Sequence, residues 1–306
     1  MSTFDQLAQT LEGIAQVRRD EALSRHTTFG VGGPADLFVI VENADQLGEV
    51  VHRATEAGEE IFVLGSGSNI LVADAGIRGV VIDNRARTTE ALEPAGRFRA
   101  ESGTSFAGFA RRLCRQGWAG LAWAVGIPGT LGGAVVYNAG AYGGCLADVL
   151  LQVRLLNNAT GESRWVDAEE LGLVYRGSIF TRGAIRGQTV LEAELELAPG
   201  DATALMEEAG SYDERRLNAQ PRGRNAGSMF KNPPEKPAWK LIDEVGLRGM
   251  RRGDAAVSDK HSNFFVNYGQ ARGDDVAWLV AEAERRVFEA YGIRLEREVA
   301  FVGAWP

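Results

Sequence analysis

Cysteine is scarce in this 306-residue chain, in which Cys114 and Cys145 are the only two. Their separation fits neither a disulfide framework nor a C-x-x-C metal site, so we expect a reducing compartment and two thiols that fill space in or near the core. The Cys, His, Asp and Glu residues form no cluster with the spacing of metal ligands. No catalytic metal is therefore expected.

Positive charge is also in deficit, because the formal net charge is −8 and no basic stretch is interleaved with aromatic residues. This balance argues against nucleic acid as a partner. The longest apolar run, 121–136, is broken by Pro128 and several glycines, so it is a poor membrane span. The first 13 residues have no positively charged segment ahead of their apolar residues, unlike a secretory signal. We expect a cytoplasmic protein that does not bind membranes.

Glycine is abundant, and it gathers in two runs. The run 124–144 is rich in both glycine and apolar residues, and the run 65–69 (GSGSN) follows the apolar segment 61–64. Glycine allows positive φ and close backbone approach, and free N–H groups at the end of a strand can bind phosphate. Two such loops predict a large ligand with a diphosphate in its middle.

Hydrophobic spacing predicts alternating helices and strands in the first two thirds of the chain. A helix begins near Phe4, a strand at 36–41 leads to a helix that Asn43 caps and Gly58 ends, and the strand 61–64 completes a βαβ unit. Further elements are strands at 79–83, 97–100 and 153–157, a helix from Thr104 or Ser105 to Gly117, and the strand 189–197. In the last of these, apolar residues alternate with glutamates, which is typical of a half-exposed antiparallel strand.

Pro199-Gly200 is a turn signal after a long strand, and we place a domain boundary there. A helix at 201–217 follows, then the long loop 220–237, whose length indicates a functional role. The remaining elements are a short helix through Leu241, a strand at 263–267, a helix around 276–287, and a strand-like tail, 293–302, that carries Glu296 and Glu298.

Seven motifs occur in a fixed order, namely HTTFGVGGPA, VLGSGSNILV, GIPGTLGGAVVYNAGAYGG, YRGSIF, GSMFKNPP, HSNFFVN and LEREV. In these motifs the chain resembles the UDP-N-acetylenolpyruvoylglucosamine reductase family over nearly its whole length. The resemblance implies an α+β fold: an N-terminal helix (1–20), an FAD-binding region of two α+β subdomains akin to vanillyl-alcohol-type (PCMH-type) oxidases (21–198), and a smaller α+β substrate-binding domain (199–306). The short interval between YRGSIF and GSMFKNPP resembles the family's shorter form, which lacks an extra substrate-closing segment.

The activity that this resemblance implies is reduction of an enolpyruvyl UDP-sugar to UDP-N-acetylmuramate, a peptidoglycan precursor. NADPH would reduce bound FAD, and the substrate would then take the hydride on its terminal carbon. Arg176 of YRGSIF would contact the substrate carboxylate, Ser228 of GSMFKNPP would protonate the carbanionic carbon, and Glu298 of LEREV would assist as general acid or electrostatic partner. Glu296 lies two residues earlier and would share a strand face with Glu298, so only motif register favours Glu298.

For FAD, we expect contacts from backbone groups of the two glycine-rich runs: Gly65, Ser66, Gly67, Ser68, Asn69, Gly126, Ile127, Pro128, Gly129, Thr130, Gly132 and Gly133, with Asn138 and Gly140 nearby. The weaker substrate candidates are Asn232, Lys231, Lys240 and His261, the last of which could equally be structural. Ala219 stands where family members often have a lysine before Gln-Pro, so the positive charge would come from Arg215, Arg216, Arg222 or Arg224.

Two rival functions share these features. One is an alcohol oxidase on the same fold, which would leave GSMFKNPP and LEREV without a role. The other is a non-catalytic binder of flavin or nucleotide sugar. We expect a monomer or weak oligomer whose partner is a small UDP-sugar.

Overall fold

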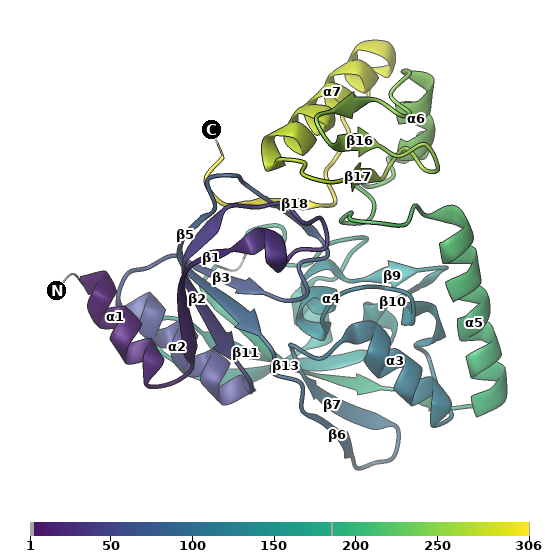
Figure 1. Ribbon diagram of the computed structural model, residues 1–306. Coiled ribbons are helices and arrows are strands. Elements are labelled where there is room, and N and C mark those ends of the chain that lie inside the picture. The colour runs from purple at the N-terminus through teal and green to yellow at the C-terminus, as the bar shows by residue number, and fades with distance from the viewer. Residues whose placement is uncertain (1–2, 185, 306) are drawn as a thin grey trace. The chain divides into compact units, whose positions relative to one another are not determined.

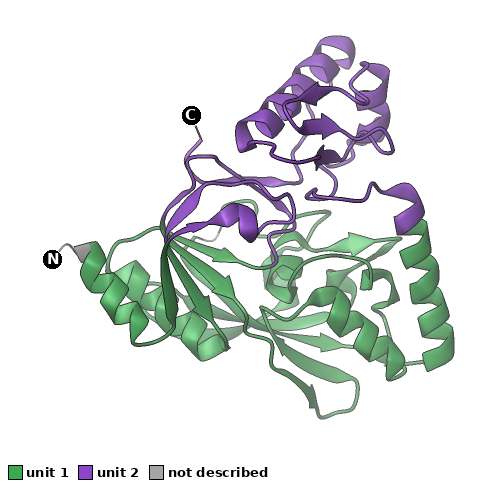
Figure 2. Cartoon of the chain, viewed as in Figure 1, with its two compact units in different colours: residues 1–19, 37–65, 79–215 green, residues 20–36, 66–78, 216–306 purple. Residues whose placement is uncertain are grey.

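A computed structural model describes residues 3–184 and 186–305. The chain forms two compact units (Figure 2). Unit 1 comprises Met1–Arg19, Leu37–Gly65 and Gly79–Arg215, and unit 2 comprises Asp20–Asp36, Ser66–Arg78 and Arg216–Pro306. Each unit therefore collects segments that are far apart in the sequence, and each has its own apolar core.

The first sheet has the strand order β1-β2-β5-β3, with β1 at Gln16–Ala22, β2 at Pro34–Val41, β5 at Ile77–Asn84 and β3 at Ile61–Leu64. Helices α1 (Thr3–Glu12) and α2 (Ala44–Glu56) lie together beside it (Figure 1). Their apolar stripes bury Leu11 and Leu47 in one cluster with Val39 and Ile82 of the strands. As predicted, the Asn43 side chain caps α2 by accepting a hydrogen bond from the Gln46 N–H.

The larger part of unit 1 is built on a five-stranded antiparallel sheet in the order β12-β11-β13-β7-β6. Its strands are β12 (Ser163–Asp167), β11 (Leu150–Asn157), β13 (Gln188–Glu196), β7 (Arg97–Glu101) and β6 (Thr89–Leu92). Helices α3 (Phe106–Arg115) and α4 (Leu131–Tyr137) accompany this sheet, and α5 (Ala202–Ala219) follows it in the chain (Figure 1). Short strand pairs complete the unit: β8 (Trp118–Ala119) with β14 (Ala198–Pro199), and β9 (Gly140–Ala141) with β10 (Gly144–Cys145).

Unit 2 contains the three-stranded sheet β15-β16-β17, made of Arg251–Arg252, Ala255–Val257 and Phe265–Asn267. Helices α6 (Ala238–Glu244) and α7 (Gly273–Tyr291) pack with it, and α7 buries the predicted stripe that includes Val276, Leu279 and Val287. A parallel pair joins β4 (Ile70–Val72) to β18 (Ala300–Val302). Four short 3₁₀ turns, Leu23–Arg25, Ala122–Ala124, Leu146–Asp148 and Ala168–Leu171, complete the described elements.

Two predictions about strands are wrong. The strand at 189–197 is antiparallel but not half-exposed: as β13 it is central in its sheet, and Glu194 is only 5% exposed because Arg99 of β7 and Gln152 of β11 cover its carboxylate. The tail is strand only at Ala300–Val302, and a bend occupies Glu298 and Val299. Glu296 and Glu298 therefore do not share a strand face.

The thiols lie as predicted, with Cys114 buried and Cys145 half-buried, and burial raises the pKa of both. Across residues 3–184 and 186–305, no group of three or more His, Cys, Asp or Glu side chains could hold a metal ion. None of the described helices is both long enough and apolar enough to cross a membrane.

Candidate active site

Gly65, the first residue of one glycine-rich run, packs against Thr130 of the other run within unit 1. Strand β3 ends at Leu64, and a Cβ atom on the next residue, Gly65, would lie 2.5 Å from Oγ1 of Thr130 in the second run. Real Cβ atoms do not approach a side-chain oxygen so closely, so any other residue at position 65 would clash with the Thr130 side chain as it lies.

The turn after Gly65 presents backbone N–H groups. Gly67 has φ +63°, and a Cβ there would lie 2.2 Å from the His26 carbonyl oxygen. Its own carbonyl accepts a hydrogen bond from the Thr28 N–H at 3.1 Å. Within the described residues, the N–H groups of Ser66 and Gly67 donate no hydrogen bond. A turn with unused N–H donors fits a phosphate of a dinucleotide.

The second run is anchored by its own backbone. The Leu131 N–H donates to the Thr104 carbonyl at 2.8 Å, and the Gly132 N–H donates to the Ser102 carbonyl at 2.8 Å. Gly132 also packs so closely that a Cβ would lie 2.9 Å from Ser102 Cβ. Gly144 similarly leaves room for the Trp123 ring, whose Cδ1 would lie 2.4 Å from a Cβ at that position. Some glycines of this run therefore serve packing within the protein.

Asn138 ends α4 in the left-handed conformation, with φ 43°. Its Oδ1 accepts from the Ala147 N–H at 3.0 Å, and its Nδ2 donates to the Val174 carbonyl at 3.1 Å. The side chain is only 5% exposed and is used by the protein itself. Asn138 therefore links the second glycine run to the turn that carries Arg176.

Arg176 sits in a tight turn, where Val174 and Gly177 exchange two backbone hydrogen bonds of 2.9 and 3.1 Å. Its φ of 52° lies in the left-handed region, which costs a non-glycine residue on the order of 1–3 kcal/mol. The turn keeps this conformation because both sides are held: Asn138 binds Val174, and the fully buried Ser178 donates its hydroxyl to the Val136 carbonyl at 2.6 Å. Strain maintained in this way is typical of functional sites.

Ser228 and Glu298 lie on adjoining segments of unit 2. Ser228 forms a β-bridge with Phe264, and the next residue, Met229, accepts a hydrogen bond from the Glu298 N–H at 2.8 Å. The Glu298 carbonyl accepts in turn from Nδ2 of Asn69 at 3.1 Å. Three predicted site residues, distant in the sequence, are thus brought together.

Asn263 holds the Ser228 segment and was not among the predicted site residues. Its backbone carbonyl accepts from the Met229 N–H at 2.7 Å, and its side chain makes two further hydrogen bonds to the Phe230 backbone. The signal in the sequence was an amide residue between Ser262 and two phenylalanines in HSNFFVN. An amide side chain among apolar residues is buried only when its hydrogen bonds are satisfied.

Glu296 differs from Glu298 in its surroundings. The Glu296 side chain is 71% exposed and pairs with Lys231, with 2.5 Å between Oε1 and Nζ. Glu298 is half-buried beside the Ser228 segment. The tertiary structure therefore distinguishes two carboxylates that strand periodicity could not.

The predicted substrate residues have partners of their own. Lys231 pairs with Glu296, and Asn232 Oδ1 accepts from the Ala238 N–H at 3.0 Å at the start of α6. The Lys240 ammonium lies 5.5 Å from the Trp239 ring centre, and the His261 ring packs between the Trp239 and Phe264 rings. Burial lowers the pKa of His261. Its Nδ1 accepts from the Asn263 N–H at 3.3 Å, so the neutral ring carries its proton on Nε2.

The arginines near Gln220-Pro221 differ in their contacts. Arg215 lies over the Tyr142 ring at 5.6 Å, and Arg224 donates to the Gly269 carbonyl at 3.2 Å while its stem covers Gly30. Arg222 is exposed. Lys260, which sequence reasoning did not consider, places its ammonium 2.8 Å from the Leu217 carbonyl near the end of α5.

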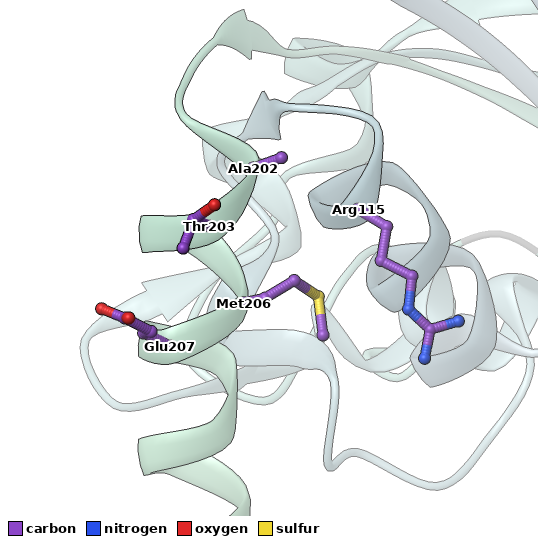
Figure 3. Close-up of a pocket in the computed structure, with 5 residues that line it drawn as sticks. All are labelled: Arg115, Ala202, Thr203, Met206 and Glu207. Atoms are coloured by element: carbon purple, nitrogen blue, oxygen red, sulfur yellow. The ribbon is translucent and has the colours of Figure 1, made fainter.

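An open hollow of about 470 Å³ lies on unit 1 between the end of α3 and the first turns of α5. Figure 3 shows its lining residues, with Met206 reaching from α5 toward the helix that carries Arg115. Ala202, Thr203 and Glu207 complete the lining, and none of the five is a predicted site residue.

Comparisons with known proteins identify the family of the chain. Residues 35–167 match the FAD binding domain family, and residues 219–302 match the UDP-N-acetylenolpyruvoylglucosamine reductase, C-terminal domain family. An FAD-binding region followed by this domain places the chain among the FAD-dependent oxidoreductases and confirms the predicted fold class.

Curated relatives are similar over almost the full chain. UDP-N-acetylenolpyruvoylglucosamine reductase of Carboxydothermus hydrogenoformans is 38% identical over 94% of each chain, and that of Gloeobacter violaceus is 41% identical over 94% of this chain and 97% of its own. The crystal structure of UDP-N-acetylenolpyruvylglucosamine reductase from Thermus caldophilus superposes with a TM-score of 0.80 and 37% identity, covering 95% of this chain and all of that one. The chain belongs to the UDP-N-acetylenolpyruvoylglucosamine reductase family, as its motifs predicted.

Proposed function

We propose that this chain reduces UDP-N-acetyl-3-O-(1-carboxyvinyl)-glucosamine to UDP-N-acetylmuramate, a step in making peptidoglycan precursors. Bound FAD supplies the hydride chemistry, with NADPH as the hydride donor. The observation that carries the proposal is the hydrogen bond from the Glu298 N–H to the Met229 carbonyl. This hydrogen bond holds the half-buried Glu298 next to the segment that carries Ser228, in a chain that belongs to the reductase family.

Ser228 is the proposed proton donor to the substrate carbon that becomes carbanionic. A hydroxyl is a weak acid, so it must be held at hydrogen-bond distance from that carbon. Asn263 supports this role because it fixes the two residues that follow Ser228. Within residues 3–184 and 186–305, the Ser228 hydroxyl donates no hydrogen bond, which leaves its proton available.

Arg176 and Glu298 are the proposed partners of the substrate carboxylate as negative charge builds there. A guanidinium stays protonated and offers paired donors, which suits a carboxylate that becomes an enediolate. The strained turn of Arg176 supports a functional role for this residue. Glu298 would act as general acid or electrostatic partner on the same group.

The two glycine-rich runs are the proposed FAD-binding segments. Ser66 and Gly67 would donate their N–H groups to the diphosphate, and residues of the second run would follow the rest of the cofactor. The proposed substrate-binding residues remain Asn232, Lys231, Lys240 and His261. Of these, His261 supports binding best, because its Nε2–H remains a donor while Nδ1 is occupied.

The domain assignment is part of the proposal: an N-terminal helix (1–20), an FAD-binding region (21–198) and a substrate-binding domain (199–306). The matches at 35–167 and 219–302 support this division. We also propose a cytoplasmic monomer or weak oligomer that does not bind nucleic acid, since its formal net charge is −8.

Anaerobic stopped-flow spectroscopy tests the function by separating its two half-reactions. NADPH should bleach the flavin, and the enolpyruvyl UDP-sugar should restore its colour. Restoration by alcohols or by oxygen alone, with no effect of the UDP-sugar, would instead support the alcohol oxidase. A purified protein that retains no flavin and turns over neither substrate would support the non-catalytic binder.

A further inference from the structure

Asn69 joins the FAD-binding turn to the segment that carries Glu298. Its backbone carbonyl accepts from the Ala300 N–H at 3.0 Å, and the parallel pairing of β4 with β18 begins directly afterwards, with Ile70 opposite Ala300. Its side-chain Nδ2 donates to the Glu298 carbonyl at 3.1 Å. The carbonyl and the side-chain amide nitrogen of Asn69 thus both bond to the C-terminal tail.

Glu298 is consequently held through both of its peptide groups. The carbonyl is bound by Asn69, and the N–H is bound by Met229, the neighbour of Ser228. The tail bends at Glu298 and Val299 and has no regular strand partner there. These two hydrogen bonds therefore fix the main chain on both sides of the Glu298 side chain.

We propose that Asn69 is a positioning residue for Glu298. Through Asn69, ordering of the FAD-binding turn also orders the tail that carries Glu298. The proposal rests on the function proposed above and assigns the Asn69 side chain to Glu298 rather than to the cofactor. When the N–H groups of Ser66 and Gly67 hold a diphosphate, the turn loses conformational freedom. The hydrogen bond from Asn69 to Glu298 then forms with less further loss of entropy, so cofactor binding favours the ordered tail.

The chemistry of position 69 defines the test. Asn69→Asp keeps the size of the side chain but replaces the donor with a carboxylate, which repels the Glu298 carbonyl. Asn69→Gln keeps a donor amide on a longer stem. Asn157→Asp is a matched control. Among the described residues, the Asn157 side chain bonds only through Oδ1, as acceptor from the Ala159 and Thr160 N–H groups, and aspartate retains that acceptor.

The first measurement is hydrogen–deuterium exchange of the peptide around Glu298 and Ala300, with and without FAD. In the wild type and in Asn157→Asp, FAD should slow exchange of this peptide. In Asn69→Asp that protection should fall about tenfold, since loss of one such hydrogen bond is worth about that factor. This readout needs no turnover, so it separates failure of the positioning role from failure of the proposed function.

The second measurement separates the half-reactions. Asn69→Asp should retain FAD and its reduction by NADPH, while the substrate step should slow about 10- to 100-fold, with partial recovery in Asn69→Gln. Equal loss of FAD binding in Asn69→Asp and Asn69→Gln would make Asn69 a cofactor ligand and overturn the proposal. Unchanged tail exchange together with an unchanged substrate step would overturn it as well. If Asn69→Asp does not fold, the same comparison with Asn69→Ser decides the question.

Discussion

Asn263 and Phe230 exchange two hydrogen bonds through a side chain: the Phe230 N–H donates to Asn263 Oδ1 at 2.9 Å, and Asn263 Nδ2 donates to the Phe230 carbonyl at 2.8 Å. Asn263 is only 3% exposed, so water cannot replace either bond. The Asn263 side chain thus bonds to the backbone after Ser228 as the backbone of a neighbouring strand would.

Removal of that amide should destabilise the protein. Asn263→Ala leaves the Phe230 N–H and carbonyl buried without partners, at about 1–3 kcal/mol each. The urea midpoint of the flavin-free protein should fall, and Asn263→Asp should not preserve it, because a buried carboxylate would face the Phe230 carbonyl. An unchanged midpoint in Asn263→Ala would contradict the role of this hydrogen-bond pair.

Ser228→Ala should separate the two half-reactions. Reduction of FAD by NADPH should stay near normal, while reoxidation by the enolpyruvyl UDP-sugar should slow by orders of magnitude, because the carbanionic carbon loses its proton donor. Ser211→Ala is the control, since Ser211 is exposed on α5 and its hydroxyl donates to the Glu208 carbonyl of the same helix. Equal loss of both half-reactions in Ser228→Ala would refute the assignment.

Glu298→Gln should impair the substrate step more than Glu296→Gln does. Glu296 is 71% exposed and forms a surface ion pair with Lys231, and such pairs contribute about 0–1 kcal/mol. Glu298, by contrast, lies beside the Ser228 segment. Single-turnover reoxidation rates of both variants provide the measurement, and the reverse ranking would move the role to Glu296.

Gly65→Ala should weaken FAD retention, because its Cβ would lie 2.5 Å from Oγ1 and 3.1 Å from Cγ2 of Thr130. Thr130→Ala removes both atoms, and the next nearest atom, Thr130 Cβ, lies at an ordinary contact distance of 3.4 Å, so the double variant should regain flavin relative to Gly65→Ala. Gly210→Ala is the control: nothing lies within 4 Å of a Cβ there, and alanine in helix α5 should be neutral or slightly stabilising. Flavin content after gel filtration measures the effect, and no rescue in the double variant would argue against the clash.

The stability of the protein should depend on pH through His261. Burial holds the pKa of His261 below its ordinary value of 6.5, so the unfolded chain binds a proton more readily than the folded chain. His261 therefore favours the folded state fully above pH 6.5, and this contribution is lost as the pH falls through 6.5 toward the lower folded pKa. Thermal unfolding of His261→Gln between pH 5 and 8 should show a shallower decline at low pH than the wild type. An identical decline in both proteins would exclude this contribution.

Local pattern in the sequence was enough for much of the fold. The apolar stripe of α7, the Asn43 cap of α2 and the short apolar segment that becomes β3 depend on neighbours within a few residues, so periodicity predicted each of them. The ordered motifs likewise indicated the family, which the comparisons confirmed.

Contacts between distant residues decided the rest. Alternation made β13 look half-exposed, but its central place in the sheet brings Arg99 and Gln152 over Glu194. Spacing along the predicted strand left Glu296 and Glu298 equivalent. In the structure, Glu296 is exposed and pairs with Lys231, whereas Asn69 and Met229 hold the Glu298 backbone near the Ser228 segment. A residue's neighbours in the chain set its local conformation. The partners of a buried polar group come from distant segments, as when the Asn267 side chain donates to the Phe29 carbonyl 238 residues away, and only folding selects them.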